Sequence, residues 1–261
     1  MKRTVKTLRQ AKGKSLIVCI TAYDAVTARI ADAADVDVIL IGDSVGNAVL
    51  GFENTVPVTP AMMAHHTAAV ARAHPNALVA TDIPFGVAHG DFSELLKICM
   101  NLMQNCGAEA VKIEGDASMA STIARLAAAG VPVWAHIGLR PQRVLADGGY
   151  RKFGKSAAEA AELIAAAKAH EAAGAFALLL EMVRPEVAAE ITRNVAIPTV
   201  GIGSGTACDG QIIVMHDILG LSPTPPSFAK IYANLGEQAV AAVSAYRDDV
   251  RAAGVPEPRA E

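Results

Sequence analysis

Eight short apolar runs, rich in β-branched residues, recur along the chain and are separated by polar or Ala-rich segments. Near-continuous apolar strands are typical of parallel sheets, because both faces of such sheets are buried. The runs are "SLIVCITAYD", "VDVILIGDS", "ALVATDIPFG", "AEAVKIEG", "VPVWAHIG", "AFALLLEMV", "IPTVGIGSG" and "GQIIVMHDILG".

The segments between these runs have helix signals. Asp91 and Glu94 open one segment with capping-box spacing, Ser156 and Glu159 open another, and each segment ends at a glycine. "TPAMMAHHTAAVARAHP" and "RPEVAAEITRNVAIP" are also predicted to be helical. Eight alternating βα units predict an α/β fold closed into a (β/α)8 TIM barrel, with an open doubly wound sheet as the alternative. The 261 residues suit one such domain over 1–261, with a frayed tail from about residue 250.

Composition and charge exclude several classes of partner. Hydrophobic residues make up 52% of the chain, and the net charge is −3 with both signs mixed. Neither a nucleic-acid footprint nor a polybasic membrane patch is present. The basic N-terminus leads into a run that reads as a first strand rather than a signal peptide, and no run approaches the roughly 20 residues of a membrane helix. We expect a soluble, cytoplasmic protein.

The four cysteines are scattered and form no C-x-x-C pair, which argues against a zinc site or a redox dithiol. We expect reduced, mostly buried thiols at Cys19, Cys99, Cys106 and Cys208.

Polar side chains gather where the predicted strands end. Active sites of (β/α)8 barrels are built at the C-terminal ends of their strands, so these side chains predict a site at that mouth. They are Tyr23, Asp24, Asp43, Ser44, Asp82, Lys112, Glu114, His136, Glu181, His216 and Asp217.

The fourth run places two charges inside the predicted barrel. Side chains alternate along a strand, so Lys112 and Glu114 point opposite to Val111 and Ile113, which should face the helices. A buried charge costs several kcal/mol unless it is paired or binds something. A structural Lys–Glu pair is one interpretation, and contact with a ligand or metal is the favoured one.

Three carboxylates from neighbouring strands predict a metal site. Asp43 and Asp82 end strands that should lie about 4.8 Å apart, and Glu114 lies one strand further on. Carboxylates that close repel unless a cation or proton intervenes, and an all-oxygen set suits Mg²⁺. Either aspartate alone could instead be a helix N-cap.

Two further strand-end residues have alternative interpretations. His136 is either a satisfied core histidine or a site residue. Glu181 is either a solvated loop carboxylate or a general base across the mouth from the metal. The adjacent His65 and His66 are expected on the surface of a helix, away from the mouth.

Three other segments are candidates for binding sites or lids. The Gly-rich "GIGSGTACDG" is weak evidence for a phosphate site. The long segments "VLGFENTVPVTP" and "LRPQRVLADGGYRKFGKS" are expected to be lids or binding loops.

Motifs spread over almost the whole chain resemble the ketopantoate hydroxymethyltransferase family. The most specific combination is "GDSVGNAVLGFENTVPVT", "VKIEG" and "DGQIIVMHDILGL", accompanied by "TAYD", "HHTAAVAR", "DIPF", "HIGLRPQ", "GGY", "IPTVGIGSG" and "FAK". After "DIPF" the chain reads "GVAHGDFSE", where many members of the family carry a bulkier stretch containing aromatic residues.

The resemblance implies a chemistry. Members of the family use Mg²⁺ and 5,10-methylenetetrahydrofolate, and assemble as decamers of two stacked pentamers. By motif, Asp43, Asp82 and Glu114 would surround the metal, with Asp43, Ser44, Asp82 and Lys112 contacting the keto acid and Glu181 accepting the proton. His136 would orient the substrate carboxylate or keto oxygen, a choice left open.

The expected reaction transfers a hydroxymethyl group to 3-methyl-2-oxobutanoate through a Mg-stabilised enolate, giving 2-dehydropantoate (ketopantoate) for pantothenate biosynthesis. One alternative is a Mg²⁺-dependent lyase or mutase of the isocitrate lyase and phosphoenolpyruvate mutase group, whose "KKCGH"-type loop is absent here. The other is a non-catalytic ligand-binding barrel, which would need no proton acceptor such as Glu181.

Overall fold

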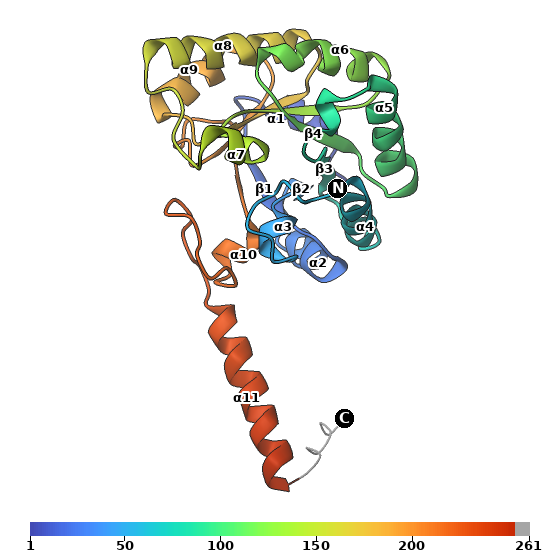
Figure 1. Cartoon of the computed structure of the whole chain (residues 1–261), viewed down its shortest axis with the longest axis vertical. Helices are drawn as coiled ribbons and strands as arrows, with labels where there is room; N and C mark the ends of the chain where they lie inside the picture. The colour runs from blue at the N-terminus through green and yellow to red at the C-terminus, as the bar shows by residue number, and fades with distance from the viewer. Residues whose placement is uncertain (254–261) are drawn as a thin grey trace. The chain divides into compact units, whose positions relative to one another are not determined.

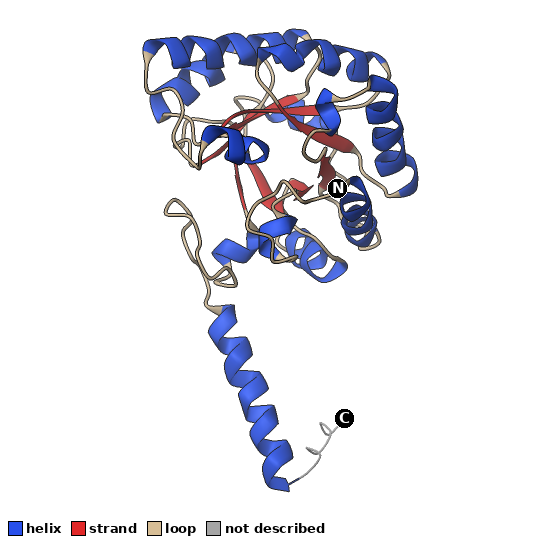
Figure 2. Cartoon of the chain, in the orientation of Figure 1, coloured by secondary structure: helices blue, strands red, loops and turns tan. Residues whose placement is uncertain are grey.

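The eight predicted strands form a closed parallel barrel in the computed structural model, which describes residues 1–253. Neighbouring strands pair in chain order and β8 pairs with β1, so the (β/α)8 prediction is confirmed and the open sheet is wrong (Figure 2). The strands are β1 (Ile17–Thr21), β2 (Val38–Ile41), β3 (Leu78–Asp82), β4 (Ala110–Glu114), β5 (Val133–Gly138), β6 (Ala177–Glu181), β7 (Thr199–Ile202) and β8 (Gly210–Ile213).

Helices cover the outside of the strands, as Figure 1 shows for α4, α5, α6, α8 and α9. The α-helices up to residue 214 are α1 (Val5–Ala11), α2 (Ala25–Ala33), α3 (Val45–Ala48), α4 (Pro60–Ala71), α5 (Phe92–Met100), α6 (Ala120–Ala128), α7 (Val144–Asp147), α8 (Ala157–Ala172) and α9 (Pro185–Asn194). Short 3₁₀ turns are η1 (Val87–His89), η3 (Ala117–Met119) and η4 (Pro141–Arg143), and a π-helical turn, η2 (Asn101–Asn105), extends α5.

The two predicted capping boxes form only in part. Asp91 and Ser156 do cap α5 and α8, each accepting a backbone N–H from the first turn. The other half of the predicted capping box, a hydrogen bond from the N-cap backbone N–H to the glutamate carboxylate, is wrong in both helices. Glu94 pairs with Lys97 instead, and Glu159 accepts two N–H groups of the loop before the helix.

The barrel interior is a column of apolar side chains that changes to polar ones toward the C-terminal mouth. Because side chains alternate along a strand, Asp82 continues the inward face of Leu78 and Ala80, and Lys112 continues that of Ala110. The other such pairs are Trp134 with His136 on β5 and Leu179 with Glu181 on β6. The layer above the hydrophobic core is therefore the layer that carries the charges.

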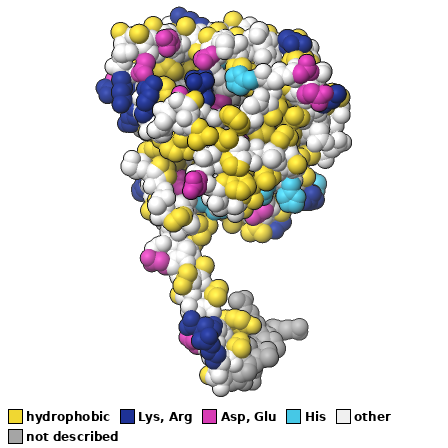
Figure 3. Space-filling view, in the orientation of Figure 1, with side chains coloured by type: hydrophobic (Ala, Val, Ile, Leu, Met, Phe, Trp, Pro, Cys, Tyr) yellow, Lys and Arg dark blue, Asp and Glu magenta, His cyan; other side chains and the backbone are white. Residues whose placement is uncertain are grey.

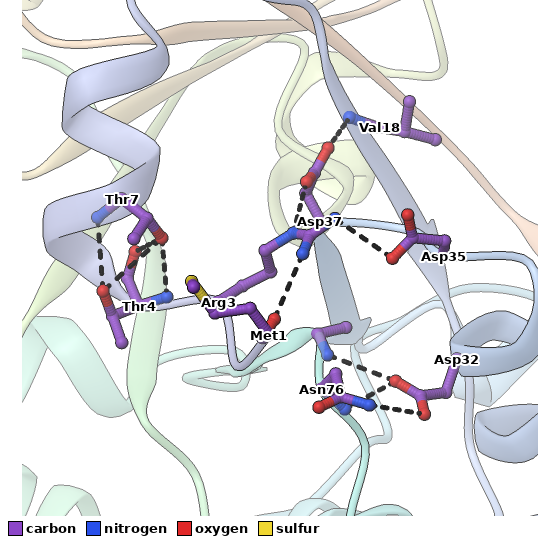
Figure 4. Close-up of polar contacts among 10 residues, drawn as sticks. Met1, Arg3, Thr4, Thr7, Val18, Asp32, Asp35, Asp37 and Asn76 are labelled. Carbon is purple, nitrogen blue, oxygen red and sulfur yellow. Dashed lines mark hydrogen bonds and ion pairs between the residues drawn. The ribbon is translucent and has the colours of Figure 1, made fainter.

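The N-terminal end of the barrel is closed by the first residues of the chain. Leu8 of α1 is buried in the barrel core beside the first residues of several strands. Arg3 Nε donates to Asp37 Oδ1 at 2.8 Å, and Asp37 Oδ2 accepts the Val18 backbone N–H at 2.9 Å (Figure 4). Lys2 Nζ adds contacts to two backbone carbonyls and to a glutamate.

The chain divides into two compact units, Met1–Val214, which holds the whole barrel, and Met215–Glu261. The second unit contains α10 (Met215–Ile218) and α11 (Leu235–Ala253). The single-domain interpretation of residues 1–261 stays a prediction. Of the predicted frayed tail, residues 250–253 belong to α11, and 254–261 lie outside the described residues.

Two simpler predictions concern the cysteines and membrane helices. All four cysteines are free and buried, as expected. Within residues 1–253, every helix is too short or too polar to cross a membrane. Figure 3 shows a face on which both signs of charge lie scattered among hydrophobic side chains.

Candidate active site

Four carboxylates, one lysine and one histidine converge at the C-terminal mouth of the barrel. Five of these residues are buried: Asp43, Asp82, Lys112, Glu114 and His136. The sixth, Glu181, keeps 17% of its side chain exposed, so it is the carboxylate that a ligand reaches most easily. The structure thus brings together six of the ionisable residues that end the predicted strands.

Lys112 is the central cation of this cluster. Its Nζ lies 2.6 Å from Asp82 Oδ1 and 3.5 Å from Glu114 Oε1. The predicted structural Lys–Glu pair is therefore secondary to a pair with the neighbouring strand, where Asp82 and Lys112 are in register. One ammonium faces four carboxylates, so the pairing leaves an excess of negative charge when all four are ionised.

Asp43 and Asp82 lie next to each other, as predicted from neighbouring strands. The Asp43 backbone N–H donates to Asp82 Oδ2 at 2.9 Å. Gly42 leaves room for the Ser44 hydroxyl, because a Cβ at that position would lie 2.7 Å from Ser44 Oγ. The N-cap interpretation is wrong for both aspartates, since the N-cap of α3 is Ser44 and Asp82 is the last residue of β3.

Burial makes the acidic groups hold protons more tightly than they would in water. Burial raises the pKa of Asp82 to about 7 and that of Glu181 to about 8, and the Lys112 ammonium only partly offsets this in each case. The pKa values of Asp43 and Glu114 are raised for the same reason. Burial opposes the charge on Lys112, but the nearby carboxylates outweigh it and raise the Lys112 pKa.

His136 is neutral, and its neighbours fix its tautomer. Burial, with the Lys112 charge, lowers the His136 pKa well below its usual value. Lys112 Nζ lies 3.1 Å from His136 Nδ1, and an ammonium can only donate, so Nδ1 accepts. The ring proton is then on Nε2, which lies 3.4 Å from Glu181 Oε2. His136 thus lies between the Lys112 ammonium and the Glu181 carboxylate.

Ser44 belongs to a second polar chain at the mouth. Its Oγ lies 2.8 Å from the Tyr23 hydroxyl, and His66 Nδ1 lies 2.7 Å from the Tyr23 carbonyl oxygen. The surface prediction is therefore wrong for His66, which is half-buried and supports Tyr23, whereas His65 is exposed.

Gln142, in η4 after β5, is a site residue that the strand-end argument missed. Its Nε2 donates to Asp43 Oδ2 at 2.8 Å and to the Ile83 carbonyl at 2.9 Å, and its backbone N–H donates to Glu114 Oε2 at 3.2 Å. The only sequence signal was its place in "HIGLRPQ" within a long loop. One loop residue thus holds two of the carboxylates.

Asp24 and the Gly-rich turn have structural roles. Asp24 is the exposed N-cap of α2. His216 and Asp217 follow β8 and lie in α10 of the second unit. In the Gly-rich turn, buried Ser204 accepts from the Val183 N–H and donates to the Leu180 carbonyl, so this turn braces the backbone. Nothing here supports a phosphate site.

The residues at the mouth suit a hard divalent cation, although a complete cage is not preformed. No group of three or more His, Cys, Asp or Glu side chains within the described part of the chain already has the arrangement of a metal site. Mg²⁺ commonly binds through one or two carboxylates and keeps several waters, so it needs no such cage. The all-oxygen set and the excess of buried carboxylates fit that mode of binding.

A pocket of about 280 Å³ opens beside this cluster. Glu114 and Gln142 line it together with residues of the loops after β3 and β5. The loop residues that matter below are Phe85, Arg140, Arg143 and Leu145.

The fold and the mouth define a (β/α)8 barrel with an acidic active-site layer over its core. The chain belongs to the ketopantoate hydroxymethyltransferase family, whose model matches residues 2–258. It is 46% identical over 98% of its length to 3-methyl-2-oxobutanoate hydroxymethyltransferase of Halalkalibacterium halodurans, covering 92% of that protein. It is 51% identical over 96% of its length to the protein of that name from Hyperthermus butylicus, covering 87% of it.

Solved structures with low sequence identity share the fold. A 2,3-dimethylmalate lyase of the PEP mutase/isocitrate lyase superfamily has a TM-score of 0.61 at 19% identity, over 100% of this chain and 92% of that one. A phosphonopyruvate hydrolase, solved with oxalate and Mg²⁺, has a TM-score of 0.61 at 19% identity, over 97% and 88%. These likenesses support the barrel alone, whereas the family match favours hydroxymethyl transfer over the lyase or mutase alternative.

Proposed function

We propose that this hydroxymethyltransferase transfers the one-carbon unit of 5,10-methylenetetrahydrofolate to 3-methyl-2-oxobutanoate, giving 2-dehydropantoate for pantothenate biosynthesis. Family membership supports the transfer and the acceptor. The observation that carries the mechanism is the accessible Glu181 carboxylate beside a buried layer of fixed charges.

Charge balance supports a divalent cation as the cofactor. The acceptor is an anion, and it must enter a layer with four carboxylates and one ammonium. Asp43, Asp82 and Glu114 would hold Mg²⁺. When bound, Mg²⁺ would act as a Lewis acid that polarises the keto group and makes the C3 proton easier to remove.

Glu181 acts as the general base in this proposal. Its raised pKa, about 8, makes the carboxylate a stronger proton acceptor than an ordinary glutamate. The His136 Nε2–H faces Glu181 Oε2, which positions the carboxylate for proton transfer. Glu181 removes the proton from C3 of the keto acid. Water cleaves the one-carbon unit from the folate nitrogens as formaldehyde and leaves tetrahydrofolate, and the carbanion adds to the formaldehyde carbon. The new alkoxide takes up the proton that Glu181 holds, which completes the hydroxymethyl group.

Lys112 and the second polar chain assist the acceptor. The Lys112 ammonium lies fixed at the centre of the layer, where it stabilises the negative charge that develops when the proton leaves C3. The Ser44 hydroxyl, held by the Tyr23 hydroxyl, would contact the keto acid together with Asp43 and Asp82.

The first test is the reaction itself. Ketopantoate formation from 3-methyl-2-oxobutanoate and methylenetetrahydrofolate should require divalent metal and stop with excess chelator. Full turnover in chelator would contradict the metal proposal. Absence of ketopantoate, with metal and both substrates present, would contradict the transfer.

We also propose a homo-oligomer, a decamer by family resemblance, in a reducing cytoplasm. The barrel exposes 73% of Leu16 and 52% of Val18, and α11 exposes 67% of Val240 and of Val243. Exposed apolar side chains of this kind suit subunit contacts, and the free buried cysteines suit a reducing compartment. Light scattering would measure the oligomer size.

A further inference from the structure

We propose that the pocket between the loops after β3 and β5 binds the folate, with its pterin ring against Phe85 and its glutamate end at Arg143. This inference rests on the proposed function, because it assigns the place of the one-carbon donor. The pocket lies over the C-terminal end of β4, the strand between β3 and β5 in the barrel.

The pocket opens onto the reacting centre. Glu114, a member of the acidic layer, lines its inner end, and Gln142 beside it donates its backbone N–H to Glu114 Oε2. A ligand that fills the pocket therefore has one end within reach of the acceptor's site. The volume of about 280 Å³ suits a bicyclic ring system, so the rest of a folate would lie at the rim.

The two ends of the pocket have opposite charge. The Glu114 carboxylate in the pocket lining is buried, whereas the Arg143 side chain is 49% exposed and marks the end of the pocket nearer to solvent. Tetrahydropterin rings present N–H donors, and the glutamate end of a folate is anionic. A folate that lies with its ring inward therefore matches the pocket at both ends, and the small keto acid would match only one.

The two arginines differ in how exposed they are and in how closely each is paired with an aspartate. Arg140 is held by Asp116 at 3.0 Å and only 16% of its side chain is exposed. Arg143 is 49% exposed, and its contact with Asp147 is long, at 3.6 Å. Arg143 can therefore exchange Asp147 for a ligand carboxylate at little cost. Phe85 is 50% exposed, and an aromatic ring in that position can pack on a flat heterocycle.

Calorimetric titration with two probes, tetrahydrofolate and 6-methyltetrahydropterin, which lacks the benzoylglutamate part, tests the assignment. R143Q should lower the affinity for tetrahydrofolate about tenfold and leave the affinity for the pterin unchanged, because only tetrahydrofolate offers carboxylates to Arg143. R143K should recover most of that loss. F85A should lower the affinity for both probes to a similar degree. R193Q is the matched control: Arg193 is exposed at the C-terminal end of α9, which leads to the opposite end of the barrel.

Three results would overturn the assignment. R143Q could leave the affinity for both probes unchanged, R143Q could lower the affinity for both probes equally, or F85A could leave the affinity for the pterin unchanged. The binding titration needs no turnover, so it separates this inference from the proposed function. If the wild-type protein bound no tetrahydrofolate, the proposed donor itself would be wrong. If it bound tetrahydrofolate and the variants behaved as wild type, only the location would be wrong.

Discussion

Lys112 Nζ lies 2.6 Å from Asp82 Oδ1, and both side chains are almost fully buried where the apolar column of the barrel ends. This pair joins two neighbouring strands at the base of the active site. Glu114 Oε1 and His136 Nδ1 also lie near Lys112 Nζ, at 3.5 Å and 3.1 Å, so the pair lies at the centre of the buried layer.

Removing the lysine should destabilise the barrel in a pH-dependent way. Lys112→Met leaves the Asp82 charge buried without its partner, which should cost roughly 3–5 kcal/mol of the free energy of unfolding at pH 8. At pH 5 the loss should be smaller, because Asp82 can take up a proton. Urea unfolding at both pH values measures the difference.

Lys97→Met is the matched control for this experiment. Lys97 also forms a short ion pair, with Glu94 at 2.7 Å, but both side chains are about two-thirds exposed. Exposed pairs contribute little, so no measurable loss is expected at either pH. An equal effect of the two substitutions would contradict the importance of burial.

Glu181→Gln should abolish the first chemical step. General bases typically contribute 10²- to 10⁴-fold, so deuterium exchange at C3 of 3-methyl-2-oxobutanoate should fall by about that factor. Binding of the keto acid should survive, because the amide has nearly the same shape. NMR follows the exchange, and Glu186→Gln, an exposed glutamate of α9, is the control. Normal exchange in Glu181→Gln would remove Glu181 as the base.

The exchange rate should depend on pH in a defined direction. Glu181 must be unprotonated to accept the C3 proton, and its pKa is raised to about 8. The rate should therefore rise with pH, and a bound divalent cation should move that rise to lower pH because its charge favours the carboxylate form. A rate that falls as pH rises would contradict an unprotonated Glu181 as the base.

The metal-free protein should lose stability as pH rises. Asp82 has a pKa of about 7 in the folded state and an ordinary value of 3.8, so between these values the folded protein binds more protons than the unfolded one. Its contribution is therefore largest below about pH 4 and is lost as pH rises through 7. Thermal unfolding in chelator should show this fall, and added Mg²⁺ should stabilise the protein more at pH 8 than at pH 5.

Substitutions at Gln142 should separate charge from hydrogen bonding. Gln142→Leu removes the donor to the Asp43 carboxylate, which should lower kcat/KM about ten- to a hundredfold. Gln142→Glu adds a like charge beside Asp43. Its kcat/KM should therefore be lower than that of Gln142→Leu at pH 8, and the difference between the two variants should be smaller at pH 6.

Gln211→Leu is the control for these variants. Gln211 also donates to a backbone carbonyl, that of Gly205, but its side chain is exposed on β8. Wild-type kcat/KM in Gln142→Leu would contradict a positioning role for Gln142.

Much of the fold and of the site was predictable because strands obey a period of two. The inward direction of Lys112 and Glu114 followed from the apolar residues between them, and parallel strands of known order brought Asp43 next to Asp82. The ion-pair partner of Lys112 was less predictable. Lys112 lies closer to Asp82, which is in register on the neighbouring strand, than to Glu114, which is two residues further along its own strand.

Loop contacts were beyond sequence reasoning. Gln142 lies 99 positions from Asp43, and no periodicity relates a loop side chain to a distant strand end. The support that His66 gives to the Tyr23 carbonyl was missed for the same reason, since a helix position predicts which face a residue takes but not which backbone group it meets. Glu94 and Glu159 had capping-box spacing, yet nearby partners competed successfully for their carboxylates.

The closure of the N-terminal end by α1 has a consequence for the order of events. Leu8 and the other apolar side chains of the core fill that end, so reactants would enter at the C-terminal mouth. In the proposed reaction the keto acid would lie below the folate and would have to bind first. The product would then leave only after tetrahydrofolate.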